Sequence, residues 1–242
     1  MRVSEATFLE IEKIDKRIRK IITDNEPSLE SAAMKFVSEI YDNFEDSIIL
    51  LRLFLTLPYN ELPKETQAFA DILAQSVNLK LEPNSYLLTL FGTIGKENEW
   101  LNIKDSRGHQ AIPLPTPDFV SAIPMMSALM EQMGFQLGWK RGEPEIVAQH
   151  IDGMMGSFYV KDAVSGEDSR GRKIIVAQDF INKYGVKSVF GIGGGRIKGG
   201  KIITVICFIN ETIERKQAIL FQPLAVTFRI LTDNLINNKK YF

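Results

Sequence analysis

Apolar positions in several stretches of this chain follow the continuous or alternating patterns of β-strands. Such runs are rich in β-branched residues and are bounded by turn residues, as strands in a packed sheet are. The stretch from Ile202 to Ile209 is almost continuously apolar and predicts a central strand that is buried on both faces. The predicted strands lie at 46–57, 85–94, 110–114 and 157–160 and in a hairpin within 187–212.

Between these strands the apolar residues recur with a helical period. Ser4 is the predicted N-cap of the first helix. Thr116 and Pro117 begin a later helix that Gly134 ends, and Pro124 is expected to kink it or to separate its first turn. The helices are predicted at 4–22, 29–44, 64–77, 117–133, 145–149 and 178–184 and from 211 to about 237.

Four isoleucines form a narrow stripe on the first helix. Ile11, Ile14, Ile18 and Ile21 recur at spacings of three, four and three residues, which is the period of a coiled-coil seam. Either the helix packs on its own domain, or the four isoleucines contact the same helix of a second chain. The chain is therefore divided into an N-terminal amphipathic helix at 1–28, a possible dimer contact, and one domain at 29–242.

The region 138–173 is the least regular part of that domain and is interpreted as an irregular insertion. Its segment SGEDSRGR at 165–172 is expected to be an exposed, mobile loop. The later glycines at 193–195 are expected to turn the terminal hairpin. A dinucleotide fingerprint is not supported there, because it would need glycine at the position of Arg196.

Composition narrows the function classes. Hydrophobic residues make up 45% and charged residues 24% of the 242 residues, and the net charge is −1. No global field attracts nucleic acid or an anionic membrane, no apolar run reaches the ~20 residues of a membrane span, and the amphipathic start is not a signal peptide. A lone cysteine, Cys207, fits a reducing compartment, so the cytoplasm is the expected location. The single cysteine and two histidines do not supply a zinc site.

Three side chains need an explanation. Arg52 interrupts the apolar run 46–57, so it either faces water from an edge strand or meets a ligand anion or an internal carboxylate. His109 hydrogen-bonds a ligand, coordinates haem iron or ties down a loop. Trp100 lies in the polar turn before it, where an indole covers a ligand and offers its N–H, or packs in the core.

Three stretches of the sequence resemble a known class of domains. They are SRGHQAIPLPTPDFVSAIPMMSALMEQMG at 106–134, AQDFINKYGVKSVFGIGGG at 177–195 and the terminal strand and helix. Together with the LLRLF segment around Arg52, they resemble an uncharacterised bacterial sensory input domain of the GAF-like class, which often precedes PAS and histidine-kinase modules. The resemblance extends over residues 30–232.

The resemblance implies an α/β (α+β) fold. Its features are a central antiparallel sheet, helices from both chain termini packed on one face, and a small-molecule pocket on the other, with dimerisation through terminal helices. The strands at 47–57, 85–94 and 110–114 would bound this pocket, and the helix at 117–133 would cover it. The expected ligand-binding residues are Arg52, Trp100, Ser106, His109, Met126 and Met130.

Two functions remain open. The first is a cytoplasmic, homodimeric sensory domain that binds a small molecule and signals through a separate protein such as a histidine kinase. The second is a protein-interaction scaffold of the same fold, with a pocket filled by Phe54, Phe91 and Met126. The cofactor is unknown, with haem through His109 as an option. An enzyme is weakly supported, because no acid–base pair or nucleophile stands out and the sulfoxide-reducing members of the GAF class need several cysteines.

Overall fold

The computed structural model describes the whole chain except residues 77, 107–108, 115, 141–142, 149–154 and 195–200. Its strands are β1 (Ile48–Pro58), β2 (Tyr86–Gly95), β3 (Ala111–Pro113), β4 (Phe135–Lys140), β5 (Glu143–Ala148), β6 (Met155–Val160), β7 (Ser188–Gly194) and β8 (Ile203–Ile209). Its helices are α1 (Phe8–Ile21), α2 (Leu29–Phe44), α3 (Lys64–Ser76), α4 (Pro117–Ala122), α5 (Pro124–Met133), α6 (Gln178–Tyr184), α7 (Arg215–Ile219) and α8 (Gln222–Asn237).

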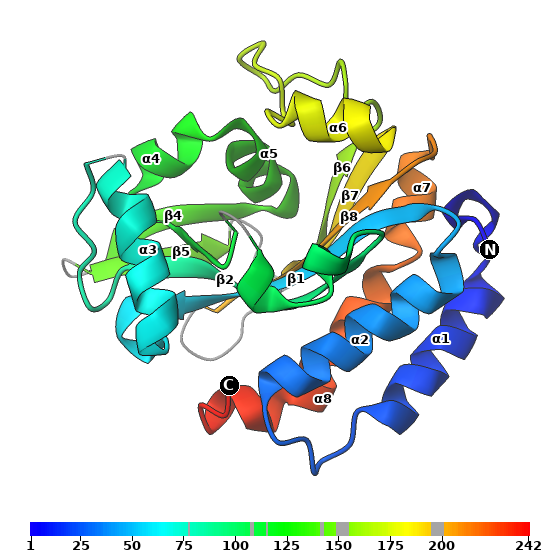
Figure 1. Cartoon of the computed structure of the whole chain (residues 1–242), viewed down its shortest axis with the longest axis horizontal. Helices are drawn as coiled ribbons and strands as arrows, with labels where there is room; N and C mark the ends of the chain where they lie inside the picture. Colours follow the sequence, from blue (N-terminus) through cyan, green and yellow to red (C-terminus); the bar gives the residue numbers. More distant parts are fainter. Residues whose placement is uncertain (77, 107–108, 115, 141–142, 149–154, 195–200) are drawn as a thin grey trace.

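The described strands form a six-stranded antiparallel sheet in the order β3-β2-β1-β8-β7-β6. The helices α1, α2 and α8 pack on one face of this sheet, whereas α4, α5 and α6 lie on the other (Figure 1). The strands β4 and β5 form a separate hairpin. The predicted α+β fold, with helices from both chain termini on one face, is therefore confirmed.

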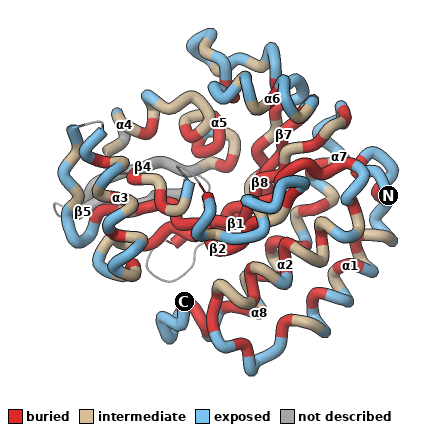
Figure 2. Tube along the Cα trace, viewed as in Figure 1, coloured by how far each residue is buried: buried red, intermediate tan, exposed pale blue. Residues whose placement is uncertain are grey.

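Strand β1 is apolar apart from Arg52 and Thr56, and its place in the sheet explains this. Successive side chains of a strand point to opposite faces of the sheet. Leu51 and Leu53 accordingly join the core under α1, α2 and α8, whereas Leu50 and Phe54 join the core on the other side. Both faces of the central strands are covered, so β1 and β8 are almost entirely buried (Figure 2).

The isoleucine stripe of the first helix is used within one chain. Ile11, Ile14 and Ile18 are buried, Ile14 completely, in the core that α1 shares with α2 and α8, and Ile21 packs against that core. These side chains are not available to a second chain in this fold, so the dimer seam is corrected to an internal contact. The first 28 residues also belong to the same core as the domain that follows.

Other local predictions are corrected at segment ends. Thr7, and not Ser4, caps the first helix, because Thr7 and Glu10 form a reciprocal capping box. The predicted helix at 145–149 lies in strand β5 as far as Ala148. Pro124 begins α5 and separates it from α4, as expected, and Gly134 ends α5 with a left-handed backbone. The closing helix is divided into α7 and α8. Of the glycines assigned to the hairpin turn, Gly193 and Gly194 instead pair within strand β7, and Gly195 lies outside the described residues.

The region 138–173 is more regular than its composition suggested. It supplies strands β4 and β5 and the edge strand β6 of the main sheet. In the loop at 165–172, Asp168 accepts hydrogen bonds from the backbone N–H groups of Arg170 and Arg172 and forms an ion pair with the Arg172 side chain. The loop therefore has a defined polar structure of its own.

The segment 215–237, which contains α7 and α8, is the one described helical stretch that is long and apolar enough by composition to cross a membrane. Of the most apolar 18-residue stretch within this segment, 44% is buried inside the fold. Leu224 and Phe228 on α8 pack completely into the helix-side core, and Phe228 contacts the ring of Phe36. These contacts are those of a core helix, and a buried core helix can be as long and as apolar as a membrane span.

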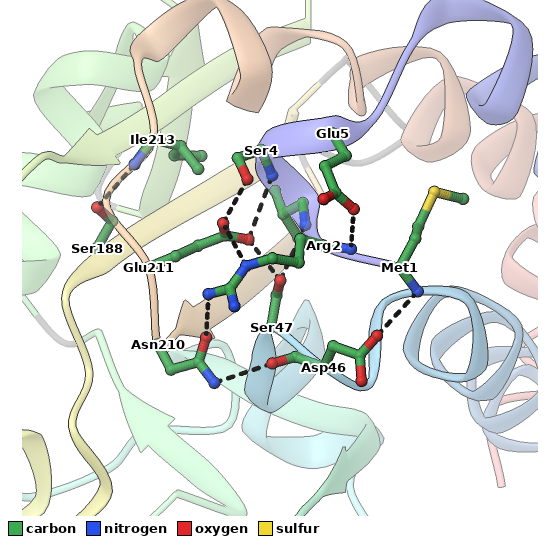
Figure 3. A network of polar contacts seen from close by, with 11 residues as sticks. Met1, Arg2, Ser4, Glu5, Asp46, Ser47, Ser188, Asn210, Glu211 and Ile213 are labelled. Atoms are coloured by element: carbon green, nitrogen blue, oxygen red, sulfur yellow. Dashed lines mark hydrogen bonds and ion pairs between the residues drawn. The ribbon is translucent and has the colours of Figure 1, made fainter.

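A buried carboxylate joins the N-terminal segment to the end of the sheet (Figure 3). Glu211, just after β8, accepts hydrogen bonds from the Ser4 hydroxyl at 2.5 Å and from the Ser47 hydroxyl, and it pairs with Arg2 at 3.2 Å. The backbone N–H of Val3 in turn donates to Ser47 Oγ at 2.9 Å. Ser4 thus has a structural role in a polar cluster and does not begin a helix.

The Glu211 cluster predicts a loss of stability in acid. Burial raises the pKa of Glu211, but the hydrogen bonds from Ser4 and Ser47 outweigh burial and leave the pKa below its ordinary value of 4.5. A lowered pKa in the folded state stabilises the protein above pH 4.5, and this contribution disappears as the pH falls through the folded value. Glu211→Gln should reduce the free energy of unfolding at pH 7 by about 1 to 3 kcal/mol.

Urea denaturation at pH 7 and at pH 4 tests this prediction. The difference between the wild type and Glu211→Gln should shrink at the lower pH. Glu12→Gln is the control, because Glu12 forms an exposed pair with Lys16 on α1. A difference that is the same at both pH values would mean that the charge of Glu211 does not stabilise the cluster.

Candidate ligand-binding site

A cavity of about 660 Å³ lies on the sheet face opposite α1, α2 and α8. Strands β1, β2, β3 and β8 form its floor, and α4 and α5 form one wall. The loop between β2 and β3 and the segment 175–180 form the other sides. The cavity is therefore bounded by the expected strands and by the expected covering helix. Strand β8 and the segment that leads into α6 also line it.

Five of the six expected site residues line this cavity: Arg52, Trp100, Ser106, His109 and Met126. The sixth, Met130, does not. It follows Met126 by one helical turn and is buried in the core on this face of the sheet. Sequence reasoning missed Ile206 and Phe208. They alternate with Cys207 along β8, so their shared face was the signal that could have assigned them to the cavity.

Arg52 is a buried cation in the cavity floor. Its strand β1 pairs with β2 on one side and β8 on the other, with Arg52 opposite Thr93 and Ile206. The position is therefore interior, which overturns the interpretation as a water-facing edge residue. Arg52 is 8% exposed, and its Nε has no hydrogen-bond partner among the described residues.

Burial also changes the chemistry of this guanidinium. Loss of hydration lowers the pKa of Arg52 from its ordinary value to about 10, and no carboxylate opposes this effect. The side chain is still protonated at neutral pH, because its pKa remains well above 7. The cavity floor thus has a full positive charge in an apolar setting.

Two hydroxyl groups near the sheet also have no partner. Ser106 follows the short helix Ile103–Asp105, is 3% exposed and lines the cavity, and its Oγ makes no hydrogen bond within the described structure. Thr93 lies directly opposite Arg52, and its Oγ1 is likewise buried without a partner in the described structure. Buried polar groups are ordinarily hydrogen-bonded, so these atoms mark a place where polar contacts are expected.

Aromatic rings close one side of the cavity. The ring of Trp100 lies 5.7 Å from that of Phe180 and 4.8 Å from that of Tyr184, and Phe180 lies 5.4 Å from Phe208. Trp100 reaches this place because Gly95 leaves room for it: a Cβ on Gly95 would lie 2.6 Å from the indole. The indole is half-buried, which suits a side chain that covers a ligand.

The rim of the cavity is charged and exposed. Glu99, Asp105 and His109 all line the cavity, and all three are exposed. His109 therefore lies at the mouth and not in the floor beside Arg52. The haem option through His109 remains an untested prediction.

No protein-family model matches the sequence, and no curated protein matches it. Among solved structures, a free methionine-R-sulfoxide reductase from Neisseria meningitidis matches with a TM-score of 0.53 and 8% identity, over 98% of this chain and 97% of that one. The sulfoxide-reducing proteins of this kind are members of the GAF class. The chain has a GAF-like fold.

Two further matches have lower scores. The chromophore-binding domain of the bacteriophytochrome RpBphP3 from R. palustris gives a TM-score of 0.46 at 8% identity, over 96% of this chain, which spans 62% of that one. The phycocyanobilin-bound GAF domain of a cyanobacterial phytochrome gives 0.46 at 10% identity, over 94% of this chain and 96% of that one. At these identities the likeness concerns the fold alone.

The cysteine of this GAF-like chain lies away from the cavity. Cys207 is 1% exposed and faces the core under the helices, whereas its neighbours Ile206 and Phe208 face the cavity. Burial, followed by the charge of Glu211, raises the pKa of the Cys207 thiol well above its ordinary value. The thiol is therefore protonated, inaccessible and on the wrong face of the sheet to bond a molecule in the cavity.

We expect Cys207 to be structural. Cys207→Ala should reduce the free energy of unfolding by roughly 1 to 2 kcal/mol, as a small buried truncation does. Ligand binding in the cavity should be retained, because the side chain lies on the opposite face. Ellman's reagent should react with the Cys207 thiol only when the protein is unfolded. Rapid modification of the folded protein would contradict this assignment.

Proposed function

We propose that this GAF-like domain binds a small molecule in the cavity and passes the resulting change to a partner protein. The observation that supports the proposal most is the cavity itself. Its volume of about 660 Å³ lies within the range of natural small-molecule sites, roughly 300 to 1,000 Å³. Its lining is mainly apolar and includes a few polar groups, as ligand sites generally do.

The alternative function, a scaffold with a filled pocket, requires side chains that pack the same space solid. Phe54 and Met126 line the cavity without closing it, and Phe91 belongs to the core on the other face of the sheet. The geometry therefore favours ligand binding over a purely structural role.

The cavity walls supply a way for a ligand to change the protein. A bound molecule would contact both the rigid floor, through β1 and β8, and the wall formed by Trp100 and the segment 175–180. Arg172, just before that segment, donates hydrogen bonds to the backbone carbonyls of Ser121 and Ala122 at 2.9 and 3.2 Å. Binding would thus stabilise one arrangement of the wall, since a ligand shifts a population toward the state that it contacts best.

The proposal also includes the cellular location, the oligomeric state and the partner of the domain. The domain is proposed to act in the cytoplasm as a homodimer and to signal through a separate protein such as a histidine kinase. The resemblance of the sequence to bacterial sensory input domains supports these points. A dimer would use surfaces other than the buried isoleucine stripe of α1, which is occupied within the chain.

Native mass spectrometry of the protein, purified after incubation with a small-molecule extract of its source cells, tests the proposal. The wild type should carry an added mass below 1 kDa in part of the population. Ile123→Trp places an indole in the cavity wall and should abolish the added mass, whereas Ile219→Trp, at an exposed site on α7, should keep it. If each of the three proteins shows only the mass of its own bare chain, the proposal is refuted.

A further inference from the structure

The charge of the cavity floor restricts what can bind there. Arg52 is the only lysine or arginine among the cavity-lining residues that the structure describes. The two acidic residues that line the cavity, Glu99 and Asp105, are exposed at the rim, whereas Arg52 is buried. The floor is therefore positive, and the mouth has acidic side chains.

Arg52 has no internal counter-ion in the described structure. Its Nε is buried without a hydrogen bond, and loss of hydration alone accounts for its lowered pKa. An unpaired buried charge destabilises a fold, and buried arginines are normally paired with carboxylates or other anions. A ligand anion would remove this penalty, because the planar guanidinium binds a carboxylate through two parallel hydrogen bonds.

The hydroxyl of Ser106 extends the same pattern. It is buried, lines the same cavity and is unpartnered in the described structure. A hydroxyl donates a hydrogen bond to an anionic oxygen without requiring a second charge. The remaining buried lining is apolar and includes Phe54, Leu88, Met126 and Ile206.

From this arrangement we infer that the ligand is a monoanionic organic acid, a carboxylate with an aliphatic or aromatic body, and that Arg52 is its counter-ion. The inference rests on the proposed function and specifies its ligand. A single buried cation matches a single negative charge. The apolar lining and the Trp100–Phe180 wall match the body of the acid.

Matched pairs of probes test the charge requirement. The acids are 4-phenylbutyrate, indole-3-acetate and octanoate, and each is compared with its neutral primary amide of nearly the same shape. Dissociation constants are measured at pH 7 by calorimetry for the wild type and for Arg52→Met. Arg229→Met, on α8 across the sheet, is the control for loss of an arginine elsewhere.

At least one acid should bind the wild type about 10- to 100-fold more tightly than its amide, the range expected for a charge-assisted hydrogen bond. Arg52→Met should bind the acid and the amide equally, and Arg229→Met should behave as the wild type. Equal affinities of every acid and its amide for the wild type would overturn the inference, and so would failure of all three acids to bind at millimolar concentration. A neutral molecule found by native mass spectrometry would overturn it as well, and would leave the proposed function standing.

Discussion

Replacing Arg52 with methionine is expected to raise the free energy of unfolding of the ligand-free protein by about 1 to 4 kcal/mol. The guanidinium is 8% exposed and has no carboxylate partner in the described structure, so the fold bears the full cost of its lost hydration. Methionine has a similar length and fits an apolar floor between Leu50 and Phe54. Urea denaturation of the ligand-free proteins at pH 7 measures the difference.

A gain of stability on removing a side chain is uncommon, since most substitutions destabilise a protein. It is the expected result where a group is kept for binding at the expense of the fold. Arg229→Met, at a half-buried site on α8, should give no comparable gain. A loss of stability in Arg52→Met would show that Arg52 has a stabilising partner in the ligand-free fold, and the account of the cavity floor would then be wrong.

Ile14→Asp is expected to unfold the protein and not to convert a dimer into a folded monomer. Ile14 is completely buried between α1 and the helices α2 and α8. Loss of a buried isoleucine alone costs about 2 to 5 kcal/mol, and a buried carboxylate adds to this cost. The sum is comparable to the whole stability of an ordinary domain, about 5 to 15 kcal/mol.

Circular dichroism and size-exclusion chromatography with light scattering separate the two outcomes. Lys13→Asp introduces the same charge at the neighbouring exposed position and should leave the fold intact. A folded Ile14→Asp monomer with unchanged melting temperature, beside a dimeric wild type, would restore the stripe as a contact between chains.

The isoleucine stripe shows one limit of sequence reasoning. A period of 3.5 residues is the same whether the partner is a twin helix or two helices of the same chain. What decides here is that Leu224 and Phe228 on α8, far along the sequence, share one core with Ile14. Such a pairing depends on tertiary structure and is not encoded in the period of either helix.

The sheet could be predicted in more detail. Strands β1 and β8 stood out because both of their faces are covered, which makes their sequences apolar without alternation. The prediction of a helix at 145–149 was wrong because the segment is too short to show a period. A run of only a few residues satisfies either period, and the pairing of Ile146 with Leu137 across the β4–β5 hairpin settles it as a strand.

The site residues that could be predicted from the sequence are those that interrupt a local pattern. Arg52 interrupts an apolar strand, and Trp100 and His109 are uncommon residues in a polar turn, so each could be identified from the sequence alone. Phe180 contributes to the cavity from α6 as an ordinary apolar residue of an amphipathic segment. Nothing in its local sequence distinguishes a ring that faces a cavity from one that fills a core, because the difference is set by what lies opposite.

A crystal structure of the protein with 4-phenylbutyrate tests the central claim most directly. The ligand should lie on the sheet face opposite α1, α2 and α8, with its carboxylate oxygens about 2.7 to 2.9 Å from the Arg52 guanidinium nitrogens. The phenyl ring should lie among the apolar side chains beside Trp100. A ligand-free cavity with Arg52 paired to Glu99 or Asp105, or a probe that binds with its carboxylate at the rim and leaves Arg52 unpaired, would contradict it.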